Sequence, residues 1–165
     1  MNFNGIEKDS MLNGEGLRVV LWVSGCNHHC KGCQNPQTWD VNSGFKFTQG
    51  TLEELIEEVD KDYIQGLTVS GGDPLHPNNK SESLRICMFI KKVLPKKDIW
   101  LYTGYSWEEI KHLEGLKYVD VLVDGKFVQE LADVNYPYAG STNQSLVDVQ
   151  KSLKSGCKII YEVVQ

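Results

Sequence analysis

The sequence predicts one α/β domain spanning residues 1–165, built on a mostly parallel sheet. Strand-like apolar segments alternate with helix-like segments, which is the pattern of βαβ units with right-handed crossovers. Apolar residues make up 41% of the chain and charged residues 24%, an ordinary balance for a globular domain. Five or six strands are too few to close a barrel of about eight strands. We therefore expect an open, partial (β/α) barrel with a gap at one side.

The strands are expected where short runs rich in β-branched and aromatic residues end at glycine or polar residues. Four such runs alternate with helices: 17–24, 66–70, 97–103 and 119–125. Apolar spacing and end signals predict helices at 51–62, at 81–94 before Pro95, and at 106–115. Thr51 with Glu54, and Ser106 with Glu109, are predicted to form capping boxes. The tail predicts two more strands, 145–150 and 157–164, joined by a short connection.

The composition argues against two classes of protein. A net charge of −5 without a basic stripe gives no general attraction for phosphate backbones, so we expect no nucleic acid as a partner. The longest apolar run, residues 19–23, is far below the roughly 20 residues needed to cross a bilayer. The N-terminus is acidic where a signal peptide would be basic. We expect a cytoplasmic protein that does not enter a membrane.

Three of the five cysteines fall in one short segment, "SGCNHHCKGCQNP" (24–36). An odd number of cysteines without an export signal argues against a disulfide framework and for thiolate ligands. A structural zinc ion would need a fourth ligand, for which His28, His29, His76 or His112 would have to serve. An iron–sulfur cluster suits thiolates, and three of them leave one iron open. We favour the cluster, and expect both histidines of the segment to be solvated loop residues.

The remaining two cysteines are not expected to bind a metal. Cys87 lies on or beside the apolar face of a predicted helix, where a free thiol packs as a small hydrophobe. Cys157 precedes the last predicted strand and is expected to have no chemical role.

Loops of unusual composition follow the predicted parallel strands, where α/β sheets place their chemistry. Besides the cysteine segment they are "SGGDP" (70–74), "YTGY" (102–105) and "DGKF" (124–127). Gly71 and Gly72 allow close approach of backbone to a ligand, and Asp73 can accept hydrogen bonds from an ammonium group. These loops should meet on one rim.

The chain resembles the radical S-adenosylmethionine (SAM) superfamily, whose hallmark is a C-x3-C-x2-C loop after the first strand and a Gly-Gly-(Glu/Asp)-Pro-like segment after the second. Within it, the chain is similar to the small glycyl-radical activases of anaerobic ribonucleoside-triphosphate reductases. The similarity runs nearly end to end, through five segments: "NGEGLRVVLWVSGCNHHCKGCQNPQTW", "SGGDPLHP", "YTGYSWEE", "VDVLVDGKFV" and "GSTNQ".

The resemblance implies a radical SAM type of partial barrel with one [4Fe-4S] cluster on Cys26, Cys30 and Cys33, and SAM on the fourth iron. It implies that the backbone of Gly32, Cys33 and Gln34 flanks the cluster and SAM, and that Gly71, Gly72 and Asp73 contact the methionine amino group. A flavodoxin-type donor would supply one electron, SAM would be cleaved to a 5′-deoxyadenosyl radical, and this would generate a glycyl radical on the large subunit of the reductase.

Other residues in the matching segments are weaker candidates. Lys126, Asn143 and Gln144 could contact SAM or the partner, although a turn and a solvated lysine are equally plausible. Tyr102, Tyr105 and Trp107 either line the adenosine region or pack in the core or rim, and Trp39 is expected to shield the cluster. Two alternatives stay open: a radical SAM enzyme acting on a small molecule, such as a deazapurine-forming synthase, and a zinc-stabilised binding module.

Overall fold

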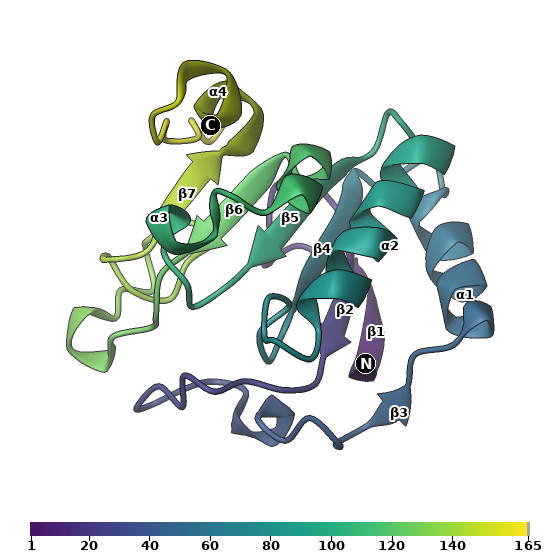
Figure 1. Ribbon diagram of the computed structural model, residues 1–165, viewed down its shortest axis with the longest axis horizontal. Coiled ribbons are helices and arrows are strands. Elements are labelled where there is room, and N and C mark those ends of the chain that lie inside the picture. Colours follow the sequence, from purple (N-terminus) through teal and green to yellow (C-terminus); the bar gives the residue numbers. More distant parts are fainter. Residues whose placement is uncertain (165) are drawn as a thin grey trace.

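A single mixed sheet forms the centre of the molecule, whose computed structural model describes residues 1–164 (Figure 1). Its strands run in the order β3-β1-β2-β4-β5-β6-β7. Their bounds are β1 (Asn2–Ser10), β2 (Arg18–Val23), β3 (Phe45–Lys46), β4 (Gly66–Gly71), β5 (Asp98–Tyr102), β6 (Val121–Asp124) and β7 (Ser145–Asp148). Within residues 1–164, no helix has the length and apolar character to cross a membrane.

The core of the sheet is parallel, as the sequence predicts. β2, β4, β5 and β6 pair in parallel, with Val20 opposite Thr68 and Thr68 opposite Trp100. β1, β3 and β7 add antiparallel strands at the two sides. The N-terminal strand β1 was not expected. Its register with β2 shifts twice and most of its residues are partly exposed, so its sequence has no clean two-residue alternation.

The helices between β3 and β6 connect the parallel strands and cover one face of the sheet, where Figure 1 shows α1 and α2 side by side. The α-helices are α1 (Gln49–Val59), α2 (Lys80–Val93), α3 (Trp107–Ile110) and α4 (Val149–Ser155). Short 3-10 helices are η1 (Pro36–Thr38), η2 (Glu114–Tyr118) and η3 (Gln129–Leu131). The third predicted helix is therefore shorter than expected: α3 ends after one turn and η2 follows.

Of the two predicted capping boxes, one is confirmed and one is wrong. The Glu109 side chain accepts a hydrogen bond from the Ser106 backbone N–H at 2.7 Å, as predicted for the start of α3. For α1 the cap is Thr48, whose extended backbone precedes the helix and whose hydroxyl accepts from Thr51 N. Thr51 Oγ1 in turn accepts from Thr48 N at 3.2 Å. Thr51 is thus the third helical residue and not the cap, and α1 begins earlier than expected.

The prediction of two strands in the tail is half wrong. β7 forms, but the expected connection is the helix α4, because Asp148 accepts from Lys151 N at 3.0 Å and so caps its start. Gly156 ends α4 in the left-handed conformation, with φ 76°. Beyond it, within the described chain, a lone bridge from Ile160 to Val147 is the only strand-like pairing. Residues 157–164 therefore do not form the predicted strand.

Alternating side chains divide the strands between two environments. One face joins α1 and α2 in a large hydrophobic core that includes Leu67, Leu101 and Cys87, which confirms the packing role predicted for Cys87. The other face carries Trp100 in a smaller cluster together with tail residue Tyr161. Arg18 is fully buried beside Trp100 and pairs with Asp98 at 2.6 Å. This second face borders the candidate site.

Candidate functional site

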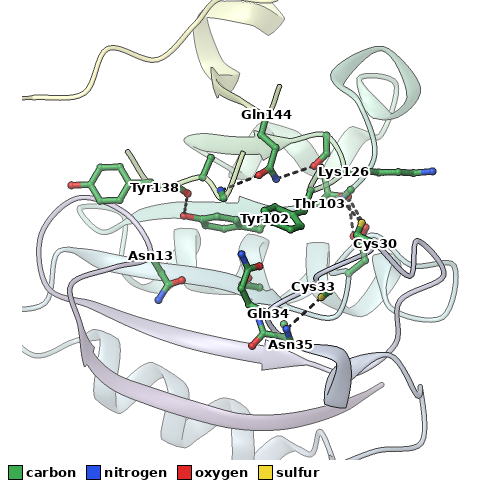
Figure 2. Close-up of a pocket in the computed structure, with 18 of the residues that line it drawn as sticks. Asn13, Cys30, Cys33, Gln34, Asn35, Tyr102, Thr103, Lys126, Tyr138 and Gln144 are labelled. Carbon is green, nitrogen blue, oxygen red and sulfur yellow. Dashed lines mark hydrogen bonds between the residues drawn. The ribbon is translucent and has the colours of Figure 1, made fainter. Parts of the chain in front are cut away.

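The loops that follow the parallel strands open into one cavity of about 730 Å³. Figure 2 shows Cys30 and Cys33 at one end of it and Asn13 and Tyr138 at the other. Nine of the eleven residues predicted for the site line it: Cys26, Cys30, Cys33, Gln34, Gly71, Gly72, Asp73, Lys126 and Gln144. Gly32 and Asn143 are outside the lining. The predicted meeting of these loops on one rim is confirmed.

The cysteine loop leaves β2 and closes on itself. Gly25 N donates to Thr38 O at 2.7 Å, and Cys26 N donates to Trp39 O at 3.0 Å. Inside this closed loop, Cys33 N donates to Cys30 O at 3.1 Å, forming a turn. The three cysteines, which lie within eight positions of the sequence, therefore all line the same cavity.

The three thiols are free and half-buried, so they are neither core residues nor fully solvated. Burial, with a further contribution from the negative charge of Asp73, raises the pKa of Cys26 above its ordinary value. Burial thus disfavours the thiolate form of Cys26, whereas ligation to a metal deprotonates a coordinating thiol. Among the described residues, no three His, Cys, Asp or Glu side chains are close enough together to hold a single metal ion.

Gly71, the last residue of β4, and Gly72, which follows it, allow the backbone to approach the end of β2 and the start of the cysteine loop closely. A Cβ on Gly71 would lie 2.5 Å from the Val23 backbone, and one on Gly72 would lie 2.5 Å from the carbonyl oxygen of Gly25. Hydrogen bonds join the same segments: Gly72 N to Val23 O at 2.8 Å, and Asp73 N to Gly25 O at 2.7 Å. The close contact between these protein segments therefore requires glycine at both positions, whether or not a ligand also binds there.

Asp73 is the centre of a buried hydrogen-bond network, with only 1% of its surface exposed. Its Oδ1 accepts from Leu75 N and from the Thr103 hydroxyl, each at 2.8 Å. Its Oδ2 accepts from Gly104 N at 2.9 Å and lies 2.7 Å from Nε2 of His28. A carboxylate offers about four acceptor positions, so donors of the protein occupy its capacity. The predicted contact of Asp73 with an amino group stays a prediction.

The two histidines of the cysteine loop behave differently from each other. The His28 side chain is only 9% exposed, and its ring packs edge-on against Tyr105, with centroids 4.7 Å apart. The prediction that His28 is a solvated loop residue is therefore wrong. His29 is exposed and stacks on Trp39 at 4.4 Å. Nothing in the sequence signals the role of His28, because its partner Asp73 is 45 positions away.

The weaker candidates mostly organise the loop between β6 and β7. Gln144 Oε1 accepts from Gly140 N at 3.0 Å, and its Nε2 donates to Gly125 O at 3.0 Å. Asn143 Nδ2 donates to the Lys126 carbonyl oxygen at 2.8 Å. These amides tie the loop together, which is the turn role that the sequence left open beside ligand contact.

The predicted aromatic residues divide between the cavity and the core. Tyr102 lines the cavity, and its hydroxyl donates to Tyr138 O at 2.6 Å. Trp107 is buried in the core and does not reach the cavity lining. Trp39 does line the cavity, beside the cysteine loop.

Part of the cavity wall was not predicted from the sequence. It comes from the turn between β1 and β2 and from the loop before β7: Met11, Leu12, Asn13, Val134, Asn135, Tyr136, Pro137, Tyr138 and Ala139. Met11, Leu12 and Val134 are largely exposed apolar side chains. No spacing rule connects these two distant segments, and only the fold brings them to one cavity.

Comparison with known proteins identifies the family. The family model of 4Fe-4S single cluster domains matches residues 12–147. A protein of Enterobacteria phage T4 is 49% identical over 146 residues, covering 88% of this chain and 93% of its own. A protein of Escherichia coli K12 is 43% identical over 148 residues, covering 87% and 96%. Both are named anaerobic ribonucleoside-triphosphate reductase-activating protein. The chain belongs to this family.

The family match associates the cysteine loop with a 4Fe-4S cluster. The match to the 4Fe-4S single cluster domain includes the three clustered cysteines and every residue that lines the cavity except Glu7 and Met11. Cys157, in contrast, lies outside the matched residues and does not line the cavity.

Proposed function

We propose that this chain is a radical SAM enzyme that activates an anaerobic ribonucleoside-triphosphate reductase by generating a glycyl radical on its large subunit. One observation carries the proposal: the three thiols of one loop line the same cavity as the Gly-Gly-Asp loop, in a chain that contains a 4Fe-4S single cluster domain. When bound, a reduced cluster would supply the one electron that cleaves SAM to methionine and a 5′-deoxyadenosyl radical. This radical would take a hydrogen atom from a glycine of the reductase, which would leave 5′-deoxyadenosine and a glycyl radical.

The donor set fits a [4Fe-4S] cluster held by Cys26, Cys30 and Cys33. Iron–sulfur clusters take thiolate ligands, and a cluster held entirely by protein uses four of them. The other two cysteines are remote in role: Cys87 is fully buried in the core, and Cys157 is exposed on the tail. Three thiols therefore leave one iron for an outside ligand, and the amine and carboxylate of SAM suit that position.

The cavity is large enough for a small ligand such as SAM. Its volume of about 730 Å³ falls in the range of about 300–1,000 Å³ that is common for small-ligand pockets. Gly32, Cys33 and Gln34 are proposed to flank the cluster and SAM through their backbone, and Gly71, Gly72 and Asp73 to contact the methionine amino group. Since the Asp73 carboxylate already accepts from several protein donors, the glycine backbone is the simpler direct contact. Lys126, Asn143 and Gln144 are candidates for contact with SAM or the partner.

The architecture is compatible with a partner that presents a protein loop. The parallel core of the sheet and its open sides support a partial barrel of the radical SAM type within a single domain, residues 1–165. Exposed Met11, Leu12 and Val134 border the cavity, so a glycine-bearing segment of the reductase could reach the bound SAM from the open side. We propose a flavodoxin-type protein as the electron donor.

The proposal is tested on protein purified without oxygen, by counting iron, sulfide and zinc per chain. SAM and dithionite are then added, and 5′-deoxyadenosine is measured with and without the reductase. We expect about four irons per chain and SAM cleavage. Cys30→Ser should lose the cluster, whereas the matched change Cys157→Ser should keep it, since Cys157 lies away from the cavity. One tightly bound zinc ion without SAM cleavage would contradict the proposal.

A further inference from the structure

We propose that His28 is a positioning residue: its imidazole, bound to Asp73, fixes the cysteine loop against the loops that follow β4 and β5. This inference rests on the proposed function, because the cluster and SAM are the groups whose placement the pair would determine. The role differs from that of a ligand, since neither His28 nor Asp73 needs to touch iron to perform it.

The contacts of His28 come from two other loops. Nε2 lies 2.7 Å from Asp73 Oδ2, on the loop after β4. The ring packs edge-on against Tyr105, on the loop after β5, at an interplanar angle of 75°. Because an ionised carboxylate only accepts hydrogen bonds, the imidazole donates to Asp73 from a proton on Nε2. A single side chain of the cysteine loop thus bridges both neighbouring loops.

The space for the imidazole is provided by a glycine. A Cβ on Gly104 would lie 2.4 Å from Cδ2 and 2.7 Å from Nε2 of His28. The same residue donates its backbone N–H to Asp73 Oδ2 at 2.9 Å. Gly104 therefore accommodates the ring and helps to orient the carboxylate that binds it. This close fit is independent of the hydrogen bond and leads to the same role for His28.

The position of His28 in the chain makes its anchoring relevant to the cluster. It lies two residues after Cys26 and two before Cys30, so a fixed imidazole restrains the backbone between two proposed ligands. Partners that orient metal ligands typically change metal affinity or activity by about 10–100-fold when they are removed. His29 offers a natural comparison, because it lies in the same loop but is exposed and stacks on Trp39.

The test uses four full-length variants beside the wild type: His28→Ala, His28→Asn, His28→Gln and His29→Asn. The amide nitrogen of glutamine can take the place of Nε2, whereas that of asparagine is too short to reach Asp73. Each chain is loaded with iron and sulfide without oxygen. The first measurement is the rate of iron loss to a ferrous chelator. The second is a titration of the reduced cluster with SAM, followed by EPR. It gives the SAM concentration at which half of the spectral change has occurred.

We expect His28→Ala and His28→Asn to lose iron about 10–100-fold faster than the wild type and to need about 10-fold more SAM. His28→Gln and His29→Asn should stay within about threefold of the wild type, because one keeps the bond to Asp73 and the other does not affect it. Rescue by glutamine but not by asparagine separates this role from a general loss of packing. If His28→Ala fails to fold, the comparison of glutamine with asparagine still decides.

Three results would overturn the inference alone: wild-type behaviour of His28→Asn, equal impairment of His28→Gln and His28→Asn, or impairment of His29→Asn as large as that of His28→Asn. A wild-type chain that assembles no four-iron cluster, or whose EPR spectrum ignores SAM, would instead overturn the proposed function and this inference with it. The wild-type measurement thus distinguishes the two failures.

Discussion

Replacing Asp73 with asparagine should destabilise the fold through the network that joins three loops. If the asparagine oxygen takes the place of Oδ1, it keeps the contacts with Leu75 N and the Thr103 hydroxyl. The amide nitrogen then replaces Oδ2 and faces the N–H of Gly104 and the Nε2 of His28. His28 can change tautomer and accept from the amide, but Gly104 N–H is left without this acceptor.

The magnitude follows from the bonds lost. A hydrogen bond to a charged group contributes about 1.5–3 kcal/mol, and a buried donor left unpaired costs about 1–3 kcal/mol. One or two lost bonds therefore predict a loss of about 2–5 kcal/mol in the free energy of unfolding. For a chain of this size, each kcal/mol lowers the melting temperature by about 2–4 °C. Asp73→Asn should melt at least about 4 °C below the wild type.

The assay is thermal unfolding of anaerobically purified protein, followed by far-ultraviolet circular dichroism. Asp40→Asn is the matched control, because Asp40 is exposed and accepts from Asn42 N in a local turn that asparagine can also form. It should melt within about 2 °C of the wild type, since exposed substitutions usually change stability by less than about 0.5 kcal/mol. An Asp73→Asn melting temperature indistinguishable from that of Asp40→Asn would refute the assignment of Asp73 as the centre of the network.

Two further predictions test the loop contact and the core. Gly72→Ala should lower the free energy of unfolding by about 1–3 kcal/mol and weaken iron retention, because its Cβ would meet the Gly25 carbonyl oxygen. Gly5→Ala is the control, because a Cβ on Gly5 would have no atom within 4 Å. Equal melting temperatures and equal iron retention in the two variants would contradict the prediction. Burial raises the pKa of the Cys87 thiol from 9.0 to about 12, so the folded state holds the thiol neutral at a pH where the unfolded chain ionises it. The stability that the buried neutral thiol contributes is therefore complete below pH 9 and is lost as the pH rises toward 12. Urea unfolding at pH 8 and 10 should show the wild type losing about 1.4 kcal/mol more than Cys87→Ala for each pH unit above 9, and equal losses would contradict the assignment.

The parallel core of the fold was predictable because its strands are buried on both faces. β2, β4, β5 and β6 are almost wholly buried, so each is a short apolar run. β1 and the tail escaped prediction for the opposite reason. β1 is partly exposed and irregular in register, while α4 depends on the local cap at Asp148 and the stop at Gly156.

The sequence predicted many of the residues that line the candidate site, but not the hydrogen bonds between them. The cysteine spacing and the Gly-Gly-Asp segment identified residues that do line one cavity. The sequence did not indicate that the Asp73 carboxylate is occupied by protein donors or that His28 is one of them. Hydrogen bonds between loops 30 to 45 positions apart follow no periodicity, and they become visible only when the strands are placed side by side.

The most direct test of the proposed function is the EPR spectrum of the reductase large subunit after incubation with this chain, SAM and a reductant without oxygen. The proposed function predicts a glycyl-radical signal that requires all of these components and disappears when Cys30→Ser replaces the wild-type chain. A signal of full intensity with Cys30→Ser would contradict the cluster assignment. No signal with a wild-type chain that holds four irons and cleaves SAM would contradict the proposed action on the reductase.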